Sequence, residues 1–181
     1  MFATSRTLID SYTLSFNLMD YTLTGAHSSF EMLYTMRKAS WAARGTGPLT
    51  VTNKEESLAK YVSKIKNLSD QYETNMENQV FTHLDNEKFK GFFNYSNKLK
   101  IAYWYNTNAT ELVWVSGPNN TMVPVKTVVN VYTMLQRFVQ NGRLALDYTL
   151  DQWALGSQLP EFRYPYDNIV SLYGALTPGY T

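Results

Sequence analysis

The sequence predicts one helix-dominated α+β domain over residues 1–181, and three observations lead to that class. In three separate segments, apolar residues recur at steps of three and four residues, as they do along one face of an α-helix. Between the second and third of these lies a segment rich in aromatic and β-branched residues and divided by turn sequences. Cysteine is absent, so neither a disulfide nor a thiolate metal site shapes the fold.

The longest periodic segment lies near the start of the chain. Its apolar seam consists of Ile9, Tyr12, Phe16, Met19, Leu23, Ala26, Phe30 and Leu33. This seam predicts one long helix from about Thr4 to Ala43, stopped by Gly45-Thr-Gly-Pro48. Further apolar residues lie beside the seam, including Leu14, Leu18, Met32 and Met36. The apolar surface is wider than a two-stranded coiled coil needs, which favours an intramolecular bundle.

A second helix is predicted after Thr52 or Asn53, either of which can cap it. Its apolar positions are Leu58, Tyr61, Ile65, Leu68 and Tyr72. Because the link after Arg44 is short, the first two helices should form an antiparallel hairpin over residues 4–84.

The second half of the chain is predicted to be mixed. Residues 98–126 should form a small antiparallel β-meander, with strands over 100–105, 111–116 and 121–125. A third helix is predicted over 127–150, with Thr127 as its cap. Its apolar positions are Val131, Leu135, Phe138, Gly142 and Ala145. Residues 156–181 carry three prolines and are expected to be a mostly irregular packing tail.

Composition and motifs argue against several function classes. The net charge of +1 comes without a basic stripe, so nucleic acid is not an expected partner. No apolar run is long enough for a membrane span within this segment. Dinucleotide-binding, phosphate-loop and hydrolase-elbow motifs are absent, and His27 and His83 are the only histidines. We therefore expect no cofactor, no metal site and no catalytic residues.

The candidate ligand-binding residues are aromatic. Tyr103, Trp104 and Tyr105 lie close to Trp114 in the predicted meander, and Arg163 follows in the tail. Rings with a polar tip suit recognition of a small molecule or a protein partner, and the arginine could hold an acidic group. The competing interpretation is that the rings are core residues and that Arg163 is a solvated loop charge.

Four Asn-x-Ser/Thr patterns are candidate glycosylation sites, at Asn67, Asn94, Asn108 and Asn119. They exceed the chance expectation only slightly, so they favour an extracytoplasmic location weakly, and a cytoplasmic one is the alternative. An extracytoplasmic location would make the domain a glycoprotein.

The functional hypothesis is a non-catalytic sensory or protein-interaction domain. The long helix and small sheet are typical of the extracytoplasmic region of a larger, membrane-anchored signalling protein, an analogy of architecture only. One alternative is a structural subunit, for example a homodimer, that assembles through the heptad seam as a coiled coil. The other is a hydrolase with an unrecognised carboxylate or serine site, and the sequence does not decide whether the protein is an enzyme.

Overall fold

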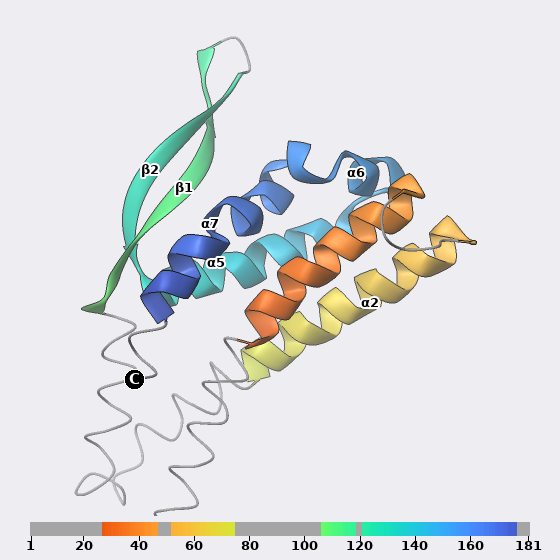
Figure 1. The fold of residues 1–181 in the computed structure, drawn as a ribbon, viewed down its shortest axis with the longest axis horizontal. Coiled ribbons are helices and arrows are strands. Elements are labelled where there is room, and N and C mark those ends of the chain that lie inside the picture. Colours follow the sequence, from red (N-terminus) through yellow and green to blue (C-terminus); the bar gives the residue numbers. More distant parts are fainter. Residues whose placement is uncertain (1–26, 47–51, 75–105, 119–120, 177–181) are drawn as a thin grey trace, which may run out of the picture.

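The computed structural model describes residues 27–46, 52–74, 106–118 and 121–176. These parts form a helix-dominated α+β fold with a small two-stranded antiparallel sheet. A helix over 27–44, orange in Figure 1, lies beside α2 (Lys54–Tyr72). The chain then supplies β1 (Asn108–Ser116), β2 (Met122–Asn130), α5 (Val131–Leu144), α6 (Leu150–Leu155) and α7 (Pro160–Leu176). Short 3-10 turns, η4 (Ala145–Asp147) and η5 (Gly156–Gln158), flank α6.

The predicted end of the first helix is confirmed at Gly45. Its positive φ of 68° suits glycine, and its N–H donates to the carbonyl of Ala42 at 3.1 Å. Asn53 caps the next helix by accepting from the Glu56 N–H at 3.3 Å. The Lys54 Nζ donates to the carbonyl of Arg44 at 3.2 Å, which ties the two helix ends together. The described parts of these two helices therefore run antiparallel (Figure 1).

The core lies where helix 27–44 meets α2, α5 and α7. Its largest fully buried side chains include Trp153, Phe138, Met32, Met36, Ile65, Met134, Leu135 and Leu172. Met32 and Met36 lie off the seam, and their burial shows that the helix packs on more than its seam face. A Cβ on Gly142 would overlap the Met32 side chain, so the glycine lets α5 approach helix 27–44 closely. Two of the eight seam residues are described: Leu33 is buried in the chain's own core, and Phe30 packs against that core.

The two strands form a hairpin that rises away from the helices (Figure 1). Its register pairs Asn108 with Asn130 at the base and Ser116 with Met122 near the tip. The N–H and C=O of Leu112 both bond to α7, so they point away from β2. By the alternation of an antiparallel pair, Pro124 and Lys126 then turn their backbone polar groups toward the outer edge of β2, which pairs with no other strand in the described parts of the chain.

The predicted third helix was wrong in its extent. Residues 127–130 continue β2, and α5 begins at Val131 with Asn130 as its cap. The Thr127 hydroxyl donates to the carboxylate of Glu111 at 2.8 Å, and β-branched Val128 and Val129 favour the strand. The periodic apolar set itself is buried as expected, from Val131 to Ala145. The helical run breaks at η4 and resumes in α6, so it does not continue to residue 150 as one helix.

The expected irregular tail was also wrong, because α7 occupies most of it. Pro160 is the first residue of the helix, where a missing N–H has no consequence. Pro165 lies inside the helix and removes one backbone hydrogen bond, which burial against the core outweighs. The predicted strand over 111–116 falls within β1, and the one over 121–125 overlaps β2 from Met122 onward. The predicted strand over 100–105 lies outside the described residues.

In the described parts of the chain, no helix is both long enough and apolar enough to cross a membrane.

Candidate functional site

The base of the hairpin is held to the helices by a buried carboxylate. Glu111 in β1 has an exposed fraction of 0%. One of its oxygens accepts from the Thr127 hydroxyl at 2.8 Å and from the Arg137 guanidinium of α5. The other accepts from the Tyr164 hydroxyl of α7 at 2.6 Å. With both oxygens engaged, Glu111 joins the sheet to two helices.

The same contact shifts the acidity of the tyrosine. Burial first, and then the hydrogen bond to the Glu111 carboxylate, raise the pKa of Tyr164 far above its usual value. The ring also packs edge-on against Phe138, with centroids 5.7 Å apart. Tyr164 therefore stays protonated and donates to Glu111 at all ordinary pH values.

A side-chain amide of α7 forms hydrogen bonds with the edge of β1 that faces away from β2. Asn168 of α7 is 1% exposed, and its Oδ1 accepts from the Leu112 N–H at 2.6 Å. Its Nδ2 donates to the Leu112 carbonyl at 2.9 Å and to the Tyr164 carbonyl at 2.9 Å. Asn168 thus stands in for a neighbouring strand at this one position, and β1 cannot slide relative to α7 without breaking these bonds.

Two of the predicted ligand-binding residues, Trp114 and Arg163, meet beside these contacts, on the same turns of α7. The Arg163 guanidinium carbon lies 3.4 Å from the centroid of the Trp114 ring. The Trp114 indole N–H donates to the carboxylate of Asp167 at 2.7 Å, and Arg163 Nε bonds the same carboxylate at 3.3 Å. These contacts occupy one face of the indole and its polar tip. The other predicted aromatics, Tyr103, Trp104 and Tyr105, lie outside the described residues.

We call the contacts of Glu111, Tyr164 and Asn168 that hold the hairpin to the helices the anchor. Sequence patterns did not indicate these three residues. Glu111, Tyr164 and Asn168 are a lone acid in a strand and two polar residues in a segment expected to be irregular. The available signal was the four-residue spacing of Tyr164, Asn168 and Leu172, which is helical. The prolines of that segment obscured it.

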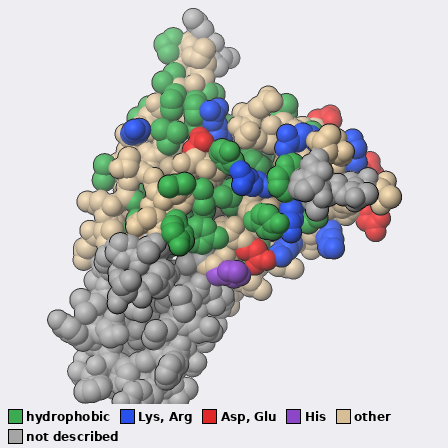
Figure 2. Space-filling model, viewed as in Figure 1, with side chains coloured by type: hydrophobic (Ala, Val, Ile, Leu, Met, Phe, Trp, Pro, Cys, Tyr) green, Lys and Arg blue, Asp and Glu red, His purple; other side chains and the backbone are tan. Residues whose placement is uncertain are grey.

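Beyond the anchor the hairpin is apolar on the face that continues from its base. Ala109 and Glu111 of this face are buried, and further along it Val113 pairs with Val125 and Val115 with Val123. We call Val113, Val115, Val123 and Val125 the valine face. The exposed fractions of Val115, Val123 and Val125 are 42%, 40% and 39%. Figure 2 shows hydrophobic side chains along this part of the hairpin.

A shallow groove of about 290 Å³ lies between α2 and α5. It is lined by Tyr72, Glu73, Gln136, Val139, Gln140 and Arg143. Arg143 bonds the Glu73 carboxylate at 2.6 Å, and this pairing lowers the pKa of Glu73. The ion pair joins the two charged side chains that line the groove, Arg143 and Glu73.

Within the described segments, no three histidine or acidic side chains come together in a way that could hold a metal ion. His83 lies outside them, and His27 pairs with Glu31 at 3.4 Å. Of the candidate glycosylation sites, Asn67 on α2 and Asn108 on β1 are exposed. Asn94 and Asn119 lie outside the described residues.

Comparisons of the chain with protein-family models, with curated proteins and with solved structures gave no match.

Proposed function

We propose that this domain is a non-catalytic protein-interaction module, and that the β1–β2 hairpin is the arm that contacts its partner. The observation that carries the proposal is the valine face. It continues the surface that packs on the helices at the hairpin base, yet Val115, Val123 and Val125 are each about two-fifths exposed. Contiguous exposed apolar surface on a soluble domain is typical of a binding site.

The physical properties of the arm suit recognition. Valine side chains are β-branched and have few rotamers, so little side-chain entropy is lost when a partner orders them. An isolated two-stranded hairpin is only marginally stable, and the Glu111 and Asn168 contacts supply the packing that it needs. The arm is thereby presented in one orientation before binding.

The finer parts of the hypothesis stay predictions. These are the sensory role, the membrane-anchored parent and the extracytoplasmic location. Asn67 and Asn108 are exposed, as glycosylation of a folded chain requires, whereas Ser69 of the first pattern is buried. Mass spectrometry of the protein from its native host tests the location, because unmodified asparagines at all four patterns would favour the cytoplasmic alternative.

The two alternative functions make different demands. Assembly through the heptad seam needs that seam at a surface. Of its two described residues, Leu33 is buried in the chain's own core and Phe30 is partly buried against that core. A hydrolase needs a free base, and both oxygens of the buried Glu111 already accept hydrogen bonds. The interaction module is therefore the function that the geometry supports best.

Photo-crosslinking from the arm tests the proposal. A photoreactive phenylalanine analogue replaces Val123 in the full-length protein in its native host, and the matched control carries it at the exposed Lys60 of α2. We expect a discrete crosslinked species from position 123 only, and its loss in a Val115→Thr, Val125→Thr background. Equal crosslinking from both positions, or none from position 123, would contradict the proposal.

A further inference from the structure

A second surface, separate from the hairpin, lies along the outer side of helix 27–44. Most of this helix is buried, and only one narrow row of side chains is accessible. The row consists of His27, Phe30, Glu31, Tyr34, Arg37, Lys38, Trp41 and Arg44. Every member is aromatic or charged. Two exposed tyrosines of α7, Tyr166 and Tyr173, lie beside it.

Two cations of this row, Arg37 and Lys38, lie over aromatic rings. The Arg37 guanidinium carbon lies 4.7 Å from the ring centroid of Tyr166, and the Lys38 Nζ lies 4.2 Å from that of Tyr34. The rings themselves are accessible, with Tyr34 52% and Tyr166 44% exposed. We call Tyr34, Arg37, Lys38, Trp41 and Tyr166 the aromatic–cationic strip.

Several cations of the described segments are paired with carboxylates. Lys64 pairs with Glu31, Lys66 with Asp70, and Arg143 with Glu73. Among the described residues, Arg37 and Lys38 form no ion pair. Cations held on rings keep their outward N–H donors available for a ligand oxygen.

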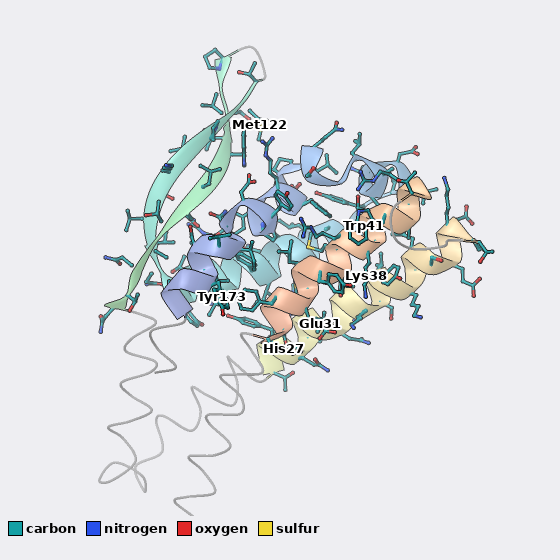
Figure 3. The ribbon with its side chains drawn as sticks, viewed as in Figure 1. His27, Glu31, Lys38, Trp41, Met122 and Tyr173 are labelled. Atoms are coloured by element: carbon teal, nitrogen blue, oxygen red, sulfur yellow. The ribbon has the colours of Figure 1, made fainter. Side chains whose placement is uncertain are left out.

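Figure 3 labels two members of the strip, Lys38 and Trp41. In Figure 3 the side chains of Lys38 and Trp41 extend from the same helix, and Tyr173 lies at its border with α7. In Figure 2 basic and hydrophobic side chains alternate over this part of the molecule. A ligand that covers the strip would meet positive charge and aromatic surface together.

We propose that the aromatic–cationic strip binds an acidic segment of a partner protein that carries apolar side chains between its carboxylates. The carboxylates would accept hydrogen bonds from Arg37 and Lys38, and the apolar side chains would pack on Tyr34, Trp41 and Tyr166. This assignment is independent of the hairpin, because the two surfaces share no residue.

An anionic membrane is the other ligand with this chemistry, and the charges favour a protein. Recognition of anionic lipid typically uses clusters of about four to eight basic residues, each worth about 1 kcal/mol. Among the described residues, the strip offers two cations without an ion pair, and each lies over an aromatic ring that restricts its position. Fixed donors suit carboxylates at defined spacing better than a fluid lipid surface.

Fluorescence anisotropy with labelled short peptides tests the proposal on the whole protein. One peptide alternates Glu with Leu and Phe, a second has Gln in place of Glu, and a third has Lys in place of Glu. We expect the acidic peptide alone to bind, with an affinity that falls as salt rises. Arg37→Gln with Lys38→Gln should weaken binding about tenfold, and Tyr34→Gln should also weaken it.

The matched control is Lys60→Gln with Lys126→Gln, which removes the same charge from exposed positions on α2 and β2. Circular dichroism confirms that every variant is folded. An equal loss in the control variant would overturn the proposal, because net charge would then explain the binding. So would the absence of binding by the acidic peptide. Binding to phosphatidylserine-containing vesicles without peptide binding would assign the strip to a membrane instead.

Discussion

At the scale of single residues, Glu111 shows why a buried charge can be retained in a small domain. Its two oxygens accept from a hydroxyl, a phenol and a guanidinium, so few lone pairs lack a donor. Burying a carboxylate costs desolvation free energy, which its hydrogen-bond partners offset. Loss of one partner therefore destabilises the fold. The cluster therefore makes the position of the hairpin depend on four side chains at once.

Replacing Glu111 tests that dependence. We expect Glu111→Gln to lower the free energy of unfolding by about 2 to 4 kcal/mol, because it leaves Arg137 without its counter-charge and mismatches one donor. Urea denaturation followed by circular dichroism measures the change. Asp70→Asn, which breaks an exposed pair with Lys66, is the control and should change stability by less than about 1 kcal/mol. Equal effects would show that burial of Glu111 does not matter.

Tyrosine acidity gives a prediction about pH. The pKa of Tyr164 is raised by burial and by Glu111, and that of Tyr148 by burial and by its hydrogen bond to Glu161. A raised pKa in the folded state means that the unfolded chain loses its protons first, from about pH 10 upward. Stability should thus be constant below pH 10 as far as these groups are concerned, and fall above it.

The slope identifies the groups responsible. Each tyrosine should contribute about 1.4 kcal/mol per pH unit above its unfolded-state pKa. Tyr164→Phe and Tyr148→Phe should each flatten the decline in urea-unfolding free energy between pH 10 and 11. Tyr34→Phe, at an exposed ring, is the control and should leave the slope unchanged. A slope that both the Tyr164→Phe and the Tyr148→Phe variants preserve would exclude these hydroxyls as its cause.

At the scale of elements, the hairpin and α7 should behave as one unit. Asn168→Ala removes both partners of the Leu112 backbone, so we expect a loss of about 2 to 4 kcal/mol in stability. We also expect faster hydrogen exchange across β1. Exchange mass spectrometry on the β1 peptides measures this, with exposed Asn67→Ala as the control. Unchanged β1 exchange in the Asn168 variant would show that the hairpin is held by other contacts.

Periodicity explains which elements could be predicted from the sequence. The apolar steps of α2 and α5 located both helices, because a single amphipathic face governs them. The predicted start of the third helix at Thr127 was wrong. A threonine can either cap a helix or form a hydrogen bond across a sheet, and the position of Glu111 decides between the two here. The prolines of α7 disfavour a helix locally, but burial of Phe162, Tyr164 and Leu172 in the core stabilises the helix nonetheless. The site depends on such long-range contacts, so its anchor was not predictable.

At the scale of the whole molecule, a core built from helix 27–44, α2, α5 and α7 lies within one chain. We therefore expect the urea midpoint to be independent of protein concentration. Denaturation at several concentrations, with light scattering on the same samples, checks this. A midpoint that rises with concentration would favour the assembly alternative, because subunit association would then contribute to stability.

Among the described residues no strand pairs with the outer edge of β2, and this has a consequence for self-association. A valine-rich strand with unpaired backbone groups is the kind of template on which chains stack into fibrils. Pro124 lacks an N–H, and its register places that gap on the outward side of β2. Lys126, the next residue to face that way, adds a charge that repels an identical strand placed opposite it. The arm can therefore stay apolar enough for recognition while its edge resists uncontrolled self-association.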